Sequence, residues 1–427
     1  MHFAHYHRGA GKITAKIIPL KNSKTFFSQL ISPFISPYRR FLNLPDVRAT
    51  LVVAFFSRMP VGMMGLSMVM YLRESLGSFK IAGSVLGVYF FSMAVGAPVQ
   101  GRIIDRIGPM LLLRVTGCLE PVSFALFIAG VWWQWPVPLL FLFAVMMGIF
   151  SPPITVLTRT LWRHRFDTDQ DRRMAFSIDS VLMEMNFTVG PALIGILLAV
   201  TSPRVAILFA WAMLLMSIVV FFKSPALQYW KQEDPGERHF LGPLTDPKLL
   251  LLFLVVFGLT TACGLLEVGY PAYATAIGLP AFAGMLLALN SFGSAIGGAI
   301  YGGLHISKPV ERQFAALLAL FAVPLLLHGV IDQNIAFAVI AFCAGFTISP
   351  AFASQALMVS RIAPAKYATE AFTWSSTFIV CGLGAGMALG GTLSETVHVK
   401  APFVAGGLLM LSMAALALFL HTKPSKT

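Results

Sequence analysis

Five ionisable side chains lie inside long apolar runs of the sequence: Arg58, Glu120, Asp179, Glu184 and Glu267. A charge inside a bilayer is costly, so residues of this kind are candidates for a binding or coupling role. The guanidinium of Arg58 cannot lose its proton, and it therefore needs a carboxylate partner or an anionic group of a substrate. A carboxyl group that is removed from water can instead exchange protons near neutral pH. Together these residues predict substrate binding coupled to proton movement.

Each of these side chains also has a purely structural interpretation. A fixed ion pair can hold two helices together without any transport role, and a residue near the end of a span can lie at the membrane surface. Arg58 is followed by Pro60 and Gly62, so we expect the first span to be broken close to its charge. Asn290, in a later apolar run, is expected either to line a cavity or to pack between helices.

The composition defines the surroundings that must position these residues. Of the 427 residues, 57% are hydrophobic and only 11% are charged, whereas a soluble protein has about 25% charged residues. The chain is therefore predicted to be an all-α integral membrane protein. Its net charge of +13 could indicate nucleic-acid binding. However, the basic residues lie between apolar runs and form no basic face interleaved with aromatic residues. We therefore expect no nucleic-acid partner.

Windows of about 20 residues give twelve apolar spans, six on each side of a polar connector. The expected organisation is a cytoplasmic tail over 1–45 that could include a helix on the membrane surface, a first six-helix bundle over 46–223, a connector over 224–246, and a second six-helix bundle with a short tail over 247–427. The spans are centred near Gly62, Phe91, Ser123, Met146, Phe187, Met213, Thr260, Ser291, Leu320, Ala344, Val380 and Leu411.

Lysine and arginine are unevenly divided between the two sets of loops. One side carries the N-terminal tail, the connector and most of the basic loop residues, while the other has only Arg73, Lys80, Arg204 and Lys400. Short basic loops face the cytoplasm. Both termini and the connector are therefore predicted to be cytoplasmic, as an even number of spans requires.

The two sets of six spans are related by an internal repeat. Residues 82–102, AGSVLGVYFFSMAVGAPVQGR, align without a gap on residues 283–303, AGMLLALNSFGSAIGGAIYGG, so that Gly83 corresponds to Gly284. Further matches occur in the same order: Ser151-Pro152 with Ser349-Pro350, and Gly190, Ala192 and Gly195 with Gly386, Ala388 and Gly391. Parallel halves of this kind place a substrate site between them near the midplane, and one half rocks against the other during transport.

The loop after the second span, GRIIDRIG at residues 101–108, resembles a signature of the major facilitator superfamily. The resemblance covers the chain from about residue 46 to its end and implies two pseudo-symmetric six-helix bundles. It keeps Gly101, Asp105, Arg106 and Gly108 but has Pro109 where a basic residue is usual. We expect Gly101 to end the helix and allow close packing, and Asp105 and Arg106 to make contacts that favour one access state. The alternative is a charged loop that only sets topology.

The fifth span, NFTVGPALIG at residues 186–195, resembles the Gly-Pro motif of proton-coupled antiporters in that family. The resemblance implies that Gly190 and Pro191 bend the helix and pack it against its partner in the other half, a role that the backbone effect of proline also supports. The copy is partial, since Asn186 replaces the leading glycine. A kink that serves packing alone is the other interpretation.

These features predict a secondary transporter for a small organic molecule, exported in exchange for protons. The runner-up is a proton symporter that imports a metabolite or an organic anion; a receptor or an enzyme is the remaining alternative. The scattered histidines and cysteines form no catalytic or metal-binding set, and no phosphate-binding loop is present. We therefore expect no enzyme activity, no cofactor and no metal. The expected state is a monomer in a bacterial plasma membrane.

Overall fold

Helices account for nearly all of the chain that the structure, a computed structural model, describes. The described residues are 43–152, 154, 158, 165–166, 169–222, 242–303, 308–363 and 368–420. The predicted N-terminal tail and the connector fall almost entirely outside them. The chain divides into two compact units, Met1–Ala49 and Thr50–Thr427, and all contacts given below lie within the second. The division into two bundles with a tail and a connector stays a prediction.

The first half of the chain contains α2 (Pro45–Leu76), α3 (Phe79–Ile107), α4 (Pro109–Trp132), α5 (Val137–Ile149), α7 (Asp169–Val200) and α8 (Pro203–Phe222). The second half contains the short 3-10 helix η2 (Gly242–Thr245), α9 (Pro247–Ala276), α10 (Phe282–Gly303), α11 (Val310–Val330), α12 (Asn334–Gly345), α13 (Ile348–Ile362), α14 (Ala368–Thr396) and α15 (Ala401–Ala417). Every predicted span centre lies in one of these helices.

Within the described residues, nine helical segments are long and apolar enough to cross a membrane, with α12 and α13 together forming one of them. Three shorter apolar helices, Val137–Ile149, Met185–Val200 and Ala401–Ala417, complete the twelve predicted spans. Hydrocarbon offers no hydrogen bonds to a backbone, so a spanning segment must be helical throughout to satisfy its own N–H and C=O groups. The prediction of an all-α membrane protein with twelve spans is confirmed.

The tenth span is broken between α12 and α13, at Phe346 and Thr347. Pro350 has no N–H, so the carbonyl of Phe346 loses its usual helical donor. That carbonyl instead approaches Gly297 of α10 closely, where any side chain would collide with it. The fourth span ends at a similar place, since α5 stops at Ile149, two residues before Ser151 and Pro152.

The expected break near Arg58 is absent. Helix α2 continues without interruption past Pro60 to Leu76, so this prediction is wrong. A proline removes one hydrogen bond of a helix, whereas a complete break inside a membrane would leave several backbone groups without partners. Continuing the helix is therefore the less costly solution.

Specific residues begin and end several helices at the membrane surface. Ser78 is the N-cap of α3 and accepts a hydrogen bond from the backbone N–H of Ile81 at 3.1 Å. Asp246 caps α9 in the same way through the N–H of Lys248 at 2.8 Å. Gly108 closes α3 with a φ of 81°, a conformation that glycine adopts without strain. These caps fix the residues at which the helices begin and end.

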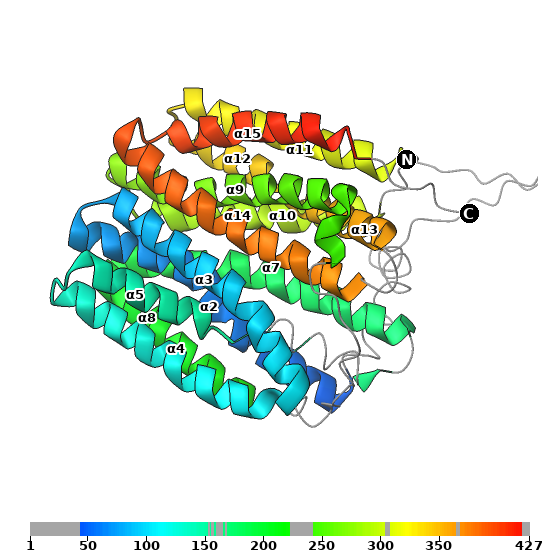
Figure 1. Cartoon of the computed structure of the whole chain (residues 1–427). Helices are drawn as coiled ribbons and strands as arrows, with labels where there is room; N and C mark the ends of the chain where they lie inside the picture. The colour runs from blue at the N-terminus through cyan, green and yellow to red at the C-terminus, as the bar shows by residue number, and fades with distance from the viewer. Residues whose placement is uncertain are drawn as a thin grey trace, which may run out of the picture. The chain divides into compact units, whose positions relative to one another are not determined.

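Two pairs of helices hold the halves together. Helix α3 packs along α14 and α7 along α10, so each pair joins one helix of the first half to one of the second (Figure 1). The remaining helices pack mainly within their own half; for example, α4 packs on α5, and α11 on α15. These four helices make the most extensive contacts between the halves, and α2 and α9 also approach each other across the interface at Gly65 and Glu267.

Candidate functional site

Two glycine pairs mark the closest approaches between the halves. A Cβ built on Gly83 of α3 would lie 3.1 Å from the Cα of Gly391 of α14. A Cβ built on Gly195 of α7 would lie 2.9 Å from the Cα of Gly284 of α10. The repeat aligns Gly83 with Gly284 and Gly195 with Gly391, so each contact is the duplicate of the other. Small residues allow such close backbone packing between membrane helices.

A polar contact joins the halves at one end of the α3–α14 pair. The hydroxyl of Ser78 donates to Oε2 of Glu395 at 2.6 Å, and the backbone N–H of Lys80 donates to the same oxygen at 2.9 Å. No pattern in the sequence singles out Glu395, which lies in the last turn of α14. Its role depends on a neighbour 317 residues away in the chain.

Glu267 lies at the interface between the halves. Its Oε2 is 3.2 Å from the position that a Cβ on Gly65 of α2 would occupy, and the methyl carbon of Met387 is 3.9 Å from the same point. Glu267 is half-buried, and it interacts electrostatically with Cys263 and Tyr270 on its own helix. A carboxyl group from the second half therefore faces the backbone of the first.

Glu120 lies inside the first half with only 2% of its surface exposed. The Tyr89 side chain interacts with it electrostatically, and the Ser151 hydroxyl interacts with both. Gln100 ties the same region together, since its Nε2 donates to the carbonyls of Ile149 and Ser151 at 2.7 and 2.9 Å. Within the described residues, Oε2 of Glu120 and Oε1 of Gln100 are buried without a hydrogen-bond partner. Such acceptors are costly unless a proton, a water or an ion supplies the missing partner.

Arg58 lies on α2 and is fully buried, with 1% of its surface exposed. The preceding residue, Ser57, donates its hydroxyl to the carbonyl of Ser217 at 3.4 Å and so links α2 to α8. A buried guanidinium is costly unless nearby groups accept its hydrogen bonds, and the predicted carboxylate or anionic-substrate partner of Arg58 stays a prediction.

Asn290 is placed between two helices of the second half. Its Nδ2 donates to the carbonyl of Ala341 at 3.0 Å, which joins α10 to α12. One of its two amide N–H groups is thus used in a helix–helix hydrogen bond, and this geometry favours the packing interpretation over the cavity interpretation.

Four candidate side chains fall outside the described residues. Asp179 and Glu184 have their backbones in α7, and Asp105 and Arg106 have theirs in α3. Their roles stay predictions from the sequence.

Gly101 differs from its expectation. Helix α3 runs through it to Ile107 and ends at Gly108, so the prediction that Gly101 ends the helix is wrong. Among the described residues, a Cβ on Gly101 would meet nothing within 4 Å, so none of them packs closely against it. The apolar-to-charged transition at residue 101 marks the edge of the hydrocarbon and not the end of the helix, because a helix continues readily where water satisfies its side chains.

The Gly-Pro segment of α7 makes contacts on two sides. Gly190 packs against Gly62 of α2 within the first half, and a Cβ there would lie 2.6 Å from the carbonyl carbon of Gly62. The carbonyl oxygen of Pro191 lies 2.6 Å from the Cβ position of Gly284 in the second half. The segment therefore touches both a helix of its own half and the partner helix expected from the motif.

Sequence reasoning missed Gln100, Ser151 and the Ser78–Glu395 pair. Ser151 had one available signal, because its Ser-Pro pair recurs at Ser349-Pro350. Among the described residues, no group of three or more His, Cys, Asp or Glu residues is arranged to hold a metal ion.

Twelve spans in two contacting halves, with buried charges on both sides of their interface, define a membrane carrier. The family model of the Major Facilitator Superfamily matches residues 50–323 and 280–427, and the chain belongs to that family. It is therefore a multi-pass membrane transporter of a small molecule and not an enzyme.

Curated relatives and a solved structure agree with this assignment. The chain is 24% identical over 379 residues to the uncharacterized MFS-type transporter YfiS of Bacillus subtilis (strain 168), covering 81% of this chain and 87% of the relative. It is 24% identical over 177 residues to the uncharacterized MFS-type transporter y4rN of Sinorhizobium fredii (strain NBRC 101917 / NGR234), covering 40% and 42%. The crystal structure of the nucleoside transporter NupG matches with a TM-score of 0.68 at 11% identity, covering 87% of this chain and 98% of that one; this likeness shows the fold alone.

Proposed function

We propose that this transporter exports a small organic molecule from a bacterial cell in exchange for protons. The observation that carries the proposal is the position of Glu267, whose carboxyl group faces Gly65 across the interface between the halves. A carboxyl group enclosed in an interface is most stable when neutral, and one that faces water is most stable when ionised. A carboxyl group between two rocking halves therefore takes up and releases its proton as part of the cycle.

The state of the two ends supports an alternating-access cycle. The end that carries Ser78 and Glu395 is closed by hydrogen bonds and by the Gly83–Gly391 approach. At the other end of α3, a Cβ built on Gly101 would meet nothing within 4 Å, so no comparable close contact holds that position among the described residues. The lysine and arginine bias favours the cytoplasmic side for that end of α3. We propose that opening and closing of the Ser78–Glu395 end is one step of the transport cycle.

Export rather than import is favoured by the Gly-Pro segment around Pro191, which resembles that of proton-coupled antiporters. Glu120, and from the sequence Asp179 and Glu184, are further candidates for carrying protons. We propose that Arg58 binds either one of these carboxylates or an anionic group of the substrate.

Inverted membrane vesicles with an acidified lumen test both coupling and direction. A panel of amphipathic organic anions and zwitterions is added while the pH gradient is followed with a fluorescent dye. We expect at least one compound to dissipate the gradient and to accumulate in the lumen when the wild-type protein is present. Glu267→Gln should abolish this proton movement, while Glu74→Gln, a change at an exposed residue of α2, should not. Accumulation that instead requires an alkaline lumen would establish import and overturn the proposed direction.

A further inference from the structure

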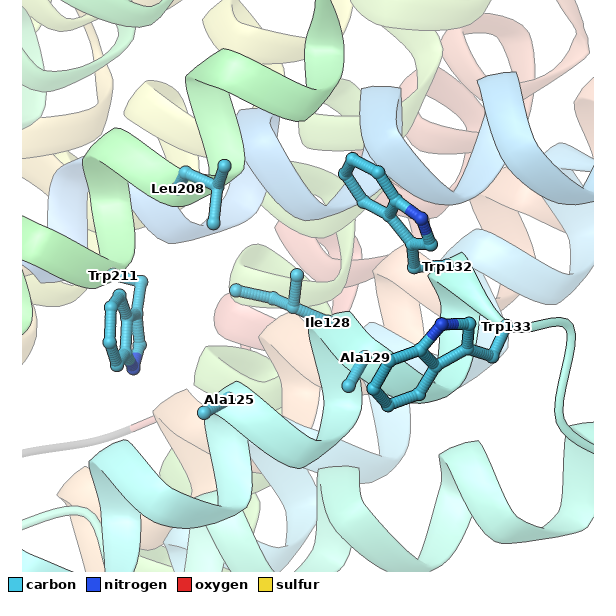
Figure 2. Close-up of a pocket in the computed structure, with 7 residues that line it drawn as sticks. All are labelled: Ala125, Ile128, Ala129, Trp132, Trp133, Leu208 and Trp211. Carbon is cyan, nitrogen blue, oxygen red and sulfur yellow. The ribbon is translucent and has the colours of Figure 1, made fainter.

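An apolar groove lies between the end of α4 and the start of α8. It has a volume of about 290 Å³, and its lining includes Ala125 and Ala129 of α4 together with the rings of Trp132, Trp133 and Trp211 (Figure 2). The principal contacts of α4 and α8 are with helices of the first half. The groove is therefore separate from the interface between the halves and from the proposed transport site.

The tryptophans place the groove at the edge of the membrane. Trp132 and Trp133 are 53% and 66% exposed at the end of α4, and tryptophan is enriched where membrane helices meet the headgroups. Trp211 lies deeper, and its indole N–H is already used, since it donates to the carbonyl of Pro121 at 3.0 Å. The groove thus runs from the headgroup level into the hydrocarbon.

A cation stands at the headgroup end of the groove. The guanidinium carbon of Arg204, at the start of α8, lies 4.8 Å from the centre of the Trp132 ring. Arg204 is exposed and forms no ion pair with any residue that the structure describes. Glu74 acts on the same Tyr71 hydroxyl as Arg204 but lies beyond ion-pair distance from it. Trp132 therefore both lines the groove and holds an unpaired positive charge at its rim.

We infer that this groove binds an anionic phospholipid, with one acyl chain against the tryptophans and the alanines and the phosphate on Arg204. Apolar lining, interfacial tryptophans and an unpaired cation match the three parts of such a lipid: its chain, its glycerol region and its charged headgroup. An arginine near the membrane surface contributes about 1 kcal/mol toward an anionic lipid, which corresponds to about a fivefold preference over a neutral lipid.

Native mass spectrometry of the purified full chain tests this inference with two lipids that share the same acyl chains, phosphatidylglycerol and phosphatidylcholine. We expect the wild-type protein to retain phosphatidylglycerol with about fivefold preference. Arg204→Ala should reduce the preference below about twofold. Arg114→Ala, a change at an exposed arginine of α4 that is not part of the groove, should leave the preference intact.

A second variant tests the groove separately from the charge. Ala129→Phe fills the groove and keeps Arg204, so it should weaken retention of both lipids; thermal unfolding confirms that each variant is folded. Wild-type preference in Arg204→Ala, or wild-type retention in Ala129→Phe, would overturn the inference.

Discussion

Ser78 and Glu395 come from different halves of the transporter and meet at one end of their interface. The Ser78 hydroxyl and the Lys80 N–H both donate to the same carboxylate oxygen, at 2.6 and 2.9 Å. Glu395 therefore caps α3 from outside its own half, at the positive end of the helix dipole. Charge-assisted hydrogen bonds of this kind are stronger than neutral ones, yet water competes for this exposed pair. The contact can therefore stabilise the closed end and still be released.

Glu395→Ala should increase the population of states in which the end that carries Ser78 is open. Both hydrogen bonds are lost, and solvent screening limits the effect to about a three- to tenfold change in the populations of closed and open states. Spin labels on Lys80→Cys and Val397→Cys, in a background without the native cysteines, report the populations as a distance distribution. Ser78→Ala should give a smaller shift, because the Lys80 N–H still donates. Identical distributions in all three proteins would exclude a role of this pair in closure.

Two glycine-to-alanine changes should have opposite effects on stability. Gly195→Ala inserts a methyl group 2.9 Å from the Cα of Gly284 and should cost about 1–3 kcal/mol through overpacking. Gly101→Ala places its methyl group in open space, and in a helix it should stabilise by about 0.5–1 kcal/mol. Thermal unfolding in one detergent compares the two variants directly. A destabilised Gly101→Ala would contradict the open surroundings described for α3.

Asn290→Ala tests whether this residue packs helices or binds substrate. Loss of its hydrogen bond to the carbonyl of Ala341 should cost about 0.6–1 kcal/mol of stability. Substrate affinity, once a transported compound is known, should stay within about twofold of wild type. A large loss of substrate affinity with unchanged stability would indicate that Asn290 binds the substrate.

Glu120→Gln should separate folding from coupling. The amide fills the same space without a charge, so the unfolding temperature should remain close to that of the wild type. Proton-driven flux should fall by about tenfold, whereas exchange of substrate across the membrane without net proton movement should continue. Glu120→Lys, which buries a cation, should instead lower stability strongly. Equal loss of exchange and driven flux in Glu120→Gln would assign Glu120 to substrate binding or to structure.

Much of the architecture could be predicted from the sequence, because apolar span length and loop charge follow directly from the membrane. The repeat also indicated which residues are equivalent, and Gly83 and Gly195 indeed make duplicate contacts with Gly391 and Gly284. Local breaks were harder to predict. Pro60 does not interrupt α2, whereas Pro350 lies just after the break between α12 and α13, because the fate of a freed carbonyl depends on what packs against it.

The candidate site was predictable only where the cost of a buried charge identifies a residue. That argument selected Glu120 and Glu267, which the structure places inside the first half and at the interface. It could not select Gln100, Ser151 or Glu395, since these polar residues gain their meaning from neighbours on other helices. Asn290 was a candidate because it is a polar residue in an apolar run, but its amide joins α10 to α12.

The two reciprocal glycine contacts are isologous in the sense used for twofold dimers: residue i of one copy touches residue j of the other, and j touches i. A single six-span unit carrying both surfaces would already be complementary to a second copy of itself. The present interface therefore preserves the geometry of a symmetric dimer within one polypeptide. Fusion then allowed features such as Ser78 with Glu395 to arise on only one of the two equivalent edges.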